Sequence, residues 1–147
     1  MAKVKTLSVK VPALKTEMTP FPYSIEAGET VSSALILMRE HAIRHLPVRE
    51  AGLLVGIISE RDVLRALSHQ EDQQEVIIRD CFLNQCYSVE IDTPLAEVLR
   101  ELVARQIGAC LVTRNGNLAG IFTTMDACRA FADLIDPRES DHENQYA

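Results

Sequence analysis

The sequence predicts an α/β fold in which two β-α-β-β-α units pack face to face with pseudo-twofold symmetry. The first observation behind this prediction is a gapless internal repeat at a shift of 64 residues, which places Gly56 on Gly120 and Asp62 on Asp126. The second is the order of strand-like and helix-like apolar patterns, which is the same in both copies. The third is the number of copies, because open solenoids need about three or more units. Two copies that cannot each close a core are therefore expected to pair.

The first copy begins with a short strand at residues 23–26, followed by a turn and by Thr30, a residue type that caps helices. Apolar residues then recur on one helical face, which predicts a helix carrying Val31, Ala34, Leu35, Met38 and Ala42. A strand starts at residues 46–48, and Ala51 with Gly52 forms the turn into a further strand at residues 53–58. The last element is a helix over residues 60–68.

The second copy repeats this order. A strand at residues 87–91 precedes a helix opened by Thr93 and Pro94, since proline suits the first helical turn. A strand at residues 109–113, a turn at Asn115 and Gly116, and a strand at residues 118–122 follow. The copy ends with a helix over residues 124–135. The matching order supports one common architecture for both copies.

The pattern divides the chain into five segments. Residues 1–16 form a basic arm with four lysines, which alternates loosely and could be a strand or an extended segment. Residues 17–68 form the first copy, residues 69–80 the linker and residues 81–135 the second copy. Residues 136–147 are polar and acidic and lack apolar periodicity, which predicts a disordered tail.

Composition excludes several classes of function. The formal net charge of −6 argues against general nucleic-acid binding, which relies on clustered lysine and arginine. No run approaches the ~18 apolar residues of a membrane span, and no secretion signal is visible at the N-terminus. The four cysteines lack a C-x-x-C pair, so no metal site is expected, and a reducing cytoplasm is the expected location. These cysteines are Cys81, Cys86, Cys110 and Cys128.

The repeated strand-to-helix junction is the best candidate for a functional site. Ser59 precedes Asp62 by three residues, and Thr123 precedes Asp126 by the same spacing. One interpretation is a capping box that satisfies free N–H groups at the helix start. The other is a ligand site, because a helix N-terminus attracts phosphate and a carboxylate can accept hydrogen bonds from a ribose diol. Both interpretations use the same geometry.

These segments carry a family resemblance. The chain resembles a tandem pair of CBS domains (cystathionine β-synthase domains), also called a Bateman module, over about residues 17–135. The resemblance rests on Met18 and Thr19 and on residues 43–48, 52–62 and 120–126. It implies a regulatory module that binds an adenosine-containing ligand, such as AMP, ADP, ATP or S-adenosylmethionine, in the cleft between the copies.

The resemblance also implies roles for individual residues. Asp62 and Asp126 would hold ribose hydroxyls, and Ser59 and Thr123 would contact phosphate. Arg44 and His45 match a place where some relatives supply basic phosphate contacts. The backbone near Ile25 and Val89 would meet the adenine edge.

The cations of the site are unevenly divided. The first copy has Arg44, His45 and Arg61, where the second copy has Gly108, Ala109 and Met125, in that order. Phosphate-rich ligands are therefore expected to depend on the first copy, although its basic groups could also serve a ligand seated on the second. A His45 side chain at its ordinary pKa of ~6.5 predicts an affinity that rises as the pH falls toward 6.

The sequence therefore predicts a cytoplasmic regulatory module, without enzymatic activity, that binds an adenine nucleotide and signals to an effector protein in trans. The alternative is a protein–protein interaction module without a physiological small-molecule ligand. The helix of the first copy carries Ile36 and Leu37 off its main apolar face, where the second copy has Arg100 and Glu101. These two side chains indicate either a deeper core position or a homodimer contact.

Overall fold

The computed structural model describes residues 10–69, 75–81 and 86–137. Within these ranges the chain forms two sheets, one for each copy of the repeat. The start of the predicted basic arm, the middle of the predicted linker and nearly all of the predicted acidic tail lie outside the described residues. None of the helices in the described part of the chain has the length and apolar character needed to span a membrane.

The first unit contains a three-stranded sheet with two helices. Its elements are β2 (Ile25–Glu26), α2 (Val31–Glu40), β3 (His45–Glu50), β4 (Leu53–Ser59) and α3 (Glu60–Ser68). Strand β3 lies in the middle, parallel to β2 and antiparallel to β4. Met38 of α2, Leu46 of β3, Ile58 of β4 and Val63 of α3 are fully buried together. Because one apolar face of each helix covers the sheet, burial of these side chains stabilises the unit.

The second unit has the same topology. Its elements are β5 (Ser88–Glu90), α5 (Leu95–Arg105), β6 (Ala109–Arg114), β7 (Asn117–Thr123) and α6 (Thr124–Ile135). Strand β6 is parallel to β5 and antiparallel to β7, and its register shifts after Val112, as that of β3 does after Val48. The predicted β-α-β-β-α order is thus confirmed in both copies.

The hairpin turns explain why each pair of strands folds back. Gly52 and Gly116 have φ angles of +77° and +79°, and Ala51 and Asn115 before them also have positive φ. Two successive residues with positive φ match the twist of the flanking strands, which makes such turns favourable for two-residue hairpins. The same turn at the same place in both copies sets the register of β3 with β4 and of β6 with β7.

Each unit also packs against a short segment that precedes the other copy in the sequence. Helix α1 (Leu14–Glu17) contacts α6, and strand β1 (Thr19–Pro20) pairs antiparallel with β7, so both pack on the second unit. Helix α4 (Ile78–Cys81) packs on the first unit. Leu14 is 1% exposed in the core of the second unit, and Ile78 is fully buried in the core of the first. Leu14 and Ile78 are equivalent positions of the repeat, so the exchange is reciprocal.

This exchange differs from the segments expected from the sequence. Helix α1 lies at the end of the predicted arm at residues 1–16, and α4 lies at the end of the predicted linker at residues 69–80. Strand β1, placed with the first copy by the sequence pattern, belongs to the sheet of the second. The physical reason is that these short segments are ordered by contacts with residues distant in the chain, which local periodicity does not reveal.

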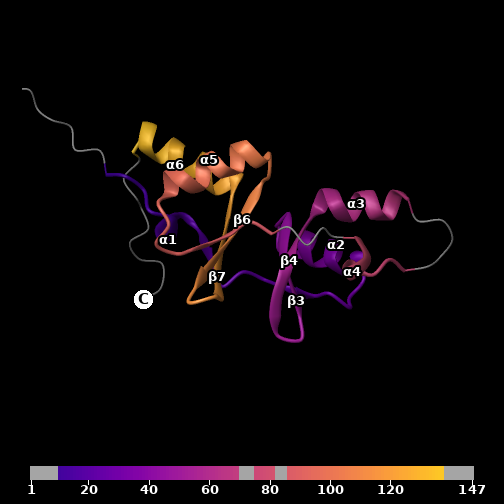
Figure 1. Ribbon diagram of the computed structural model, residues 1–147. Helices are drawn as coiled ribbons and strands as arrows, with labels where there is room; N and C mark the ends of the chain where they lie inside the picture. The colour runs from indigo at the N-terminus through magenta and orange to yellow at the C-terminus, as the bar shows by residue number, and fades with distance from the viewer. Residues whose placement is uncertain (1–9, 70–74, 82–85, 138–147) are drawn as a thin grey trace, which may run out of the picture.

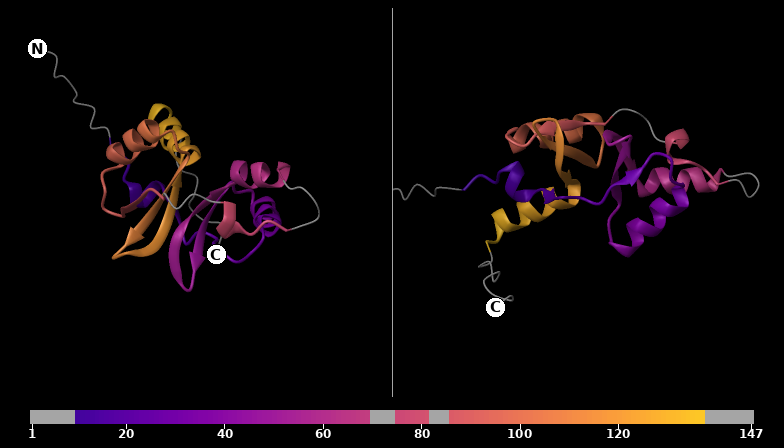
Figure 2. Two further views of the ribbon diagram at one scale, coloured as in Figure 1. Left: turned by 45° about the vertical axis from the view of Figure 1, so that its right-hand side comes forward. Right: turned by 90° about the horizontal axis from the view of Figure 1, so that it is seen from below.

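The two units meet through their sheets (Figure 1 and Figure 2). Leu54 and Ile57 of β4 pack against a buried cluster formed by Ala109, Leu111 and Ile121 of β6 and β7. The expected face-to-face packing of two α/β copies is therefore present. It places the N-terminal end of α3 near the start of the second unit's central strand.

Candidate functional site

Both strand-to-helix junctions form a complete capping box. At the start of α3, Oδ2 of Asp62 accepts hydrogen bonds from the backbone N of Ser59 at 3.0 Å and from its Oγ at 2.6 Å, while Oγ accepts from the Asp62 backbone N. At the start of α6, Oδ2 of Asp126 and Oγ1 of Thr123 make the same contacts. The capping interpretation of both segments is correct. Each aspartate still has a second carboxylate oxygen, Oδ1, for another partner.

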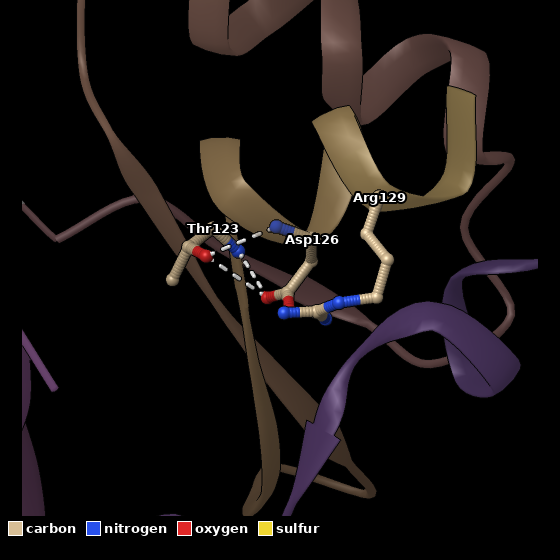
Figure 3. Close-up of polar contacts among 3 residues, drawn as sticks. All are labelled: Thr123, Asp126 and Arg129. Atoms are coloured by element: carbon tan, nitrogen blue, oxygen red, sulfur yellow. Dashed lines mark hydrogen bonds and ion pairs between the residues drawn. The ribbon is translucent and has the colours of Figure 1, made fainter. Parts of the chain in front are cut away.

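The two aspartates differ in what that second oxygen contacts. Oδ1 of Asp126 accepts a hydrogen bond from Nη1 of Arg129 at 3.0 Å, and Asp126 is only 5% exposed (Figure 3). Arg65 occupies the equivalent position in the first copy, but within the described residues it forms no hydrogen bond or ion pair with Asp62. In that part of the structure, Oδ1 of Asp62 has no hydrogen-bond partner. Asp62 therefore has an oxygen available to a ligand.

A pocket of about 1070 Å³ lies at the first junction, between the two units. The first unit contributes five of the residues predicted for the site: Arg44, His45, Ser59, Arg61 and Asp62. The second unit contributes Tyr87 and the turn and strand start at residues 106–109, and Cys81 comes from α4. A ligand in this pocket would contact both copies of the repeat at once.

The pocket is lined by charged side chains, with three arginines and two carboxylates, and by apolar side chains. Arg44, Arg61 and Arg65 line it together with the carboxylates of Glu60 and Asp62. Within the described residues none of the three arginines forms an ion pair. Ile57 and Ala109 from the facing sheets form the apolar wall, beside Tyr87. This arrangement suits a ligand with a flat apolar part and a negatively charged part.

The other predicted site residues lie elsewhere. Thr123 and Asp126 form the second junction and do not line the pocket. Ile25 is 8% exposed in the core of the first unit, and Val89 packs against the core of the second. The structure thus brings together five candidates, all from the first copy. Ile25, Val89 and the pair from the second copy do not line the pocket.

The pocket-lining residues that sequence reasoning missed include Arg65, Tyr87 and Cys81. Arg65 lies three residues after Asp62, on the same face of the helix, which was a usable signal. Tyr87 aligns with Tyr23 in the repeat, and both rings are stacked: Arg105 lies 4.5 Å from the Tyr87 centroid, and His41 lies 3.7 Å from that of Tyr23. Cys81 had no local signal, because α4 was not predicted.

His45 reaches across the interface between the units. A Cβ atom added at Gly108 would lie 3.4 Å from Nε2 of His45, so the imidazole packs against the second unit. Burial lowers the pKa of His45 from its ordinary value of 6.5; Asp62 raises it and Arg44 lowers it further. The pKa of ~6.5 expected for His45 from the sequence is therefore too high. Any gain in phosphate affinity from its protonation is expected at more acidic pH.

The lowered pKa of His45 also predicts a pH-dependent stability. Because the pKa of His45 is lower in the folded chain, the unfolded chain binds the imidazole proton more readily below about pH 6.5. The free energy of unfolding is therefore highest above that pH and decreases as the pH falls. The parent is expected to lose more free energy of unfolding than a His45→Gln variant between about pH 7.5 and about pH 5, by about 1.4 kcal/mol for each unit of pKa difference. Urea denaturation of both proteins across this range measures the difference. Parallel pH profiles would contradict it.

Fold and pocket together define a class of protein: a tandem-repeat α/β module whose two copies exchange a segment and enclose a pocket between them. The family model for the CBS domain matches residues 13–69 and 77–133. The chain therefore belongs to the CBS-domain family and carries two CBS domains. Both matched ranges begin just before the exchanged helices α1 and α4.

Curated proteins that the chain resembles include relatives at 30% identity or more. A protein of Methanopyrus kandleri is 36% identical over 110 residues, which cover 73% of this chain and 56% of the relative. YlbB of Bacillus subtilis is 30% identical over 127 residues, which cover 80% of this chain and 85% of YlbB. The chain thus spans little more than half the length of the Methanopyrus relative.

Solved structures of CBS proteins have the same fold. AcuB from Vibrio cholerae has a TM-score of 0.76 at 26% identity, and the match covers 91% of this chain and all of AcuB. The CBS domain pair of the protein MJ0100 has a TM-score of 0.75 at 23% identity and covers 84% of this chain and 98% of that pair. The MJ0100 pair was solved in complex with 5′-methylthioadenosine and S-adenosyl-L-methionine.

Proposed function

We propose that this chain is a regulatory module that binds an adenine nucleotide, AMP, ADP or ATP, in the pocket at the first junction and signals its occupancy to an effector protein in trans. The observation that carries the proposal is that Oδ1 of Asp62, which has no hydrogen-bond partner among the described residues, shares a pocket with three arginines that form no ion pair within that part of the chain. A carboxylate accepts hydrogen bonds from a ribose diol, and arginine binds phosphate through paired N–H groups. The adenosine ligands of the MJ0100 pair support the same ligand class.

Each part of the nucleotide has a chemically matched wall. The ribose is placed over Asp62, and the phosphates extend toward Arg44, Arg61 and Ser59, where the N-terminus of α3 adds a favourable dipole. The adenine lies against the apolar wall formed by Ile57 and Ala109. A nucleotide is favoured over S-adenosylmethionine here, because the sulfonium of the latter would face the arginines.

The pocket also supports a mechanism of regulation. It is lined by residues of both units, so a bound ligand contacts both. A ligand that binds one arrangement of the units more tightly than another shifts the population toward that arrangement. The effector protein would respond to the shifted arrangement, and no chemical conversion of the ligand is required.

The test is a titration of AMP, ADP, ATP, S-adenosylmethionine and NAD, by thermal shift and calorimetry, into the parent and two matched variants. A nucleotide at 100 times its dissociation constant is expected to stabilise the parent by about 2.7 kcal/mol. Asp62→Asn is expected to weaken its binding about tenfold or more, because a hydrogen bond to a charged group is worth about 1.5–3 kcal/mol. Asp126→Asn disturbs the same kind of cap outside the pocket and is expected to leave affinity unchanged.

Two outcomes contradict the proposal in different ways. If no ligand in the series binds, the chain is better described as a protein–protein interaction module. If both variants bind as the parent does, the ribose lies elsewhere. Each substitution alters a cap worth only about 0.5–2 kcal/mol, so both variants are expected to remain folded.

We further propose that the chain forms a homodimer through its helices. Ile36 on α2 is 58% exposed, whereas Leu37 packs against the core of the first unit, so only Ile36 supports the contact. Val103 on α5 and Phe131 on α6 are also exposed apolar side chains, at 78% and 63%. Ile36→Arg is expected to raise the dimer dissociation constant about tenfold, since burial of one such side chain is worth about 1.5–3 kcal/mol. A parent that is monomeric by light scattering at high micromolar concentration would contradict the proposal.

A further inference from the structure

We propose that Arg129 blocks the pseudo-symmetric counterpart of the ligand pocket, so that the chain holds one nucleotide rather than two. This inference rests on the proposed function for the placement of ribose over the aspartate. It goes further because it assigns to Arg129 the role of restricting the ligand to the first of the two equivalent strand-to-helix junctions. The counterpart position is the second junction, where Thr123 and Asp126 repeat the geometry of Ser59 and Asp62.

The contact between Arg129 and Asp126 occupies the group that a ribose would use. Oδ2 of Asp126 is engaged by Thr123, and Oδ1 accepts from Nη1 of Arg129 at 3.0 Å. The Asp126 side chain is 6% exposed and that of Arg129 is 65% exposed, so the guanidinium lies on the solvent side of the carboxylate. Figure 3 shows it folded back against Asp126. The arginine thus donates where a ribose hydroxyl would donate.

The first junction shows that this contact is not a necessary result of the sequence spacing. Arg65 follows Asp62 by three residues, as Arg129 follows Asp126. Yet Arg65 lines the pocket, and no hydrogen bond or ion pair joins it to Asp62 in the described part of the chain. The two copies therefore use the same pair of residue types in two different arrangements, one open and one closed.

The charged residues around the second junction determine which ligand it could bind if the Arg129 side chain were removed. Gly108 and Met125 stand where the first junction has Arg44 and Arg61. Glu17 of α1 stands at the repeat position of Cys81, and α1 contacts α6. Thr124 stands in place of Glu60, so Glu17 leaves the number of carboxylates equal, and a phosphate would find two fewer arginines at these positions than in the first pocket. Without the Arg129 side chain, the second position is expected to take a nucleoside that lacks phosphate.

The experiment counts ligands per chain by calorimetry and native mass spectrometry, with adenosine and AMP as probes. The parent is expected to bind one of either probe. Arg129→Ala is expected to bind two molecules of adenosine but one of AMP, and adding Asp126→Asn to it is expected to restore a count of one. Arg100→Ala, which removes an exposed arginine of α5 away from both junctions, is the control and is expected to keep a count of one for adenosine.

The outcomes separate this inference from the proposed function. Two equal sites in the parent, or an unchanged adenosine count in Arg129→Ala, would overturn the role of Arg129 while leaving nucleotide binding at Asp62 intact. Adenosine binding by Arg129→Ala together with no binding by the parent would support the role of Arg129 and end the proposed function. If neither protein binds either probe, both fail. Thermal melting verifies folding, and Arg129→Gln replaces the alanine variant if that variant unfolds.

Discussion

A Gly120→Val variant is expected to lose about 3 kcal/mol of its free energy of unfolding, the upper end of the usual range for overpacking. A Cβ atom at this position in β7 would lie 2.5 Å from Sδ of Met18 and 2.9 Å from the backbone O of Thr19. The methionine side chain can move, but the carbonyl oxygen cannot do so without separating β1 from β7. The burial of Leu14 in the second core would be disturbed with it. Urea denaturation of parent and variant measures the loss.

Gly28→Ala is the matched control for this substitution. A Cβ atom at Gly28 would have only Nη2 of Arg79 nearby, at 3.8 Å, and Gly28 does not have a positive φ. Alanine at a compatible position restricts the unfolded chain, so this variant is expected to be equal to the parent or up to about 1 kcal/mol more stable. A Gly120→Val protein as stable as the parent would show that the N-terminal segment does not dock on β7.

Arg61→Ala is expected to weaken the binding of AMP and ATP about tenfold or more, while adenosine binding changes little. The reason is that Arg61 lines the pocket without an ion pair among the described residues, and a charge-assisted hydrogen bond to phosphate is worth about 1.5–3 kcal/mol. Arg44→Ala is expected to act in the same way. The loss should shrink at high salt, since mobile ions screen exposed charges. Calorimetric titration of the three ligands at two salt concentrations measures it.

Met125→Ala is the matched control for the arginine variants, because Met125 holds the position of Arg61 in the second copy and is 63% exposed. It is expected to leave the binding of all three ligands unchanged. Equal losses for adenosine and ATP in Arg61→Ala would mean that this arginine supports the fold or the base. The phosphate would then have to contact other residues.

Much of the fold could be predicted because it follows from local patterns that occur twice. The Thr30 cap, the apolar face that includes Val31 and Met38, and the paired turns at Gly52 and Gly116 were all visible in the sequence, and the structure contains each of them. Helices α1 and α4 were not predicted. Each has only four residues, and each is held by one buried side chain in a core formed by distant parts of the chain.

In the candidate site, too, features set by residues close in sequence could be predicted, whereas features set by contacts between distant residues could not. The capping boxes could be predicted from three-residue spacing, and Arg44, His45, Ser59, Arg61 and Asp62 line one pocket while Ile25 lies in the core. The different orientations of Arg65 and Arg129 could not be predicted, because their sequence spacing to the aspartate is identical. Burial lowers the pKa of His45, and its imidazole lies against Gly108 of the other unit, a contact that local sequence does not reveal.

The reciprocal exchange has a consequence for synthesis of the protein on the ribosome. Thr19 pairs with Ile121, so the N-terminal segment emerges well before the strand that it joins. At about 5–20 residues per second, roughly 5–20 seconds separate the two events. During that interval Leu14 has no core in which to bury its side chain, whereas Ile78 of α4 is made early enough to complete the first core. The first core can therefore close about halfway through synthesis, whereas the second core can take up Leu14 only when nearly the whole chain has been made, so the first CBS domain is expected to fold before the second.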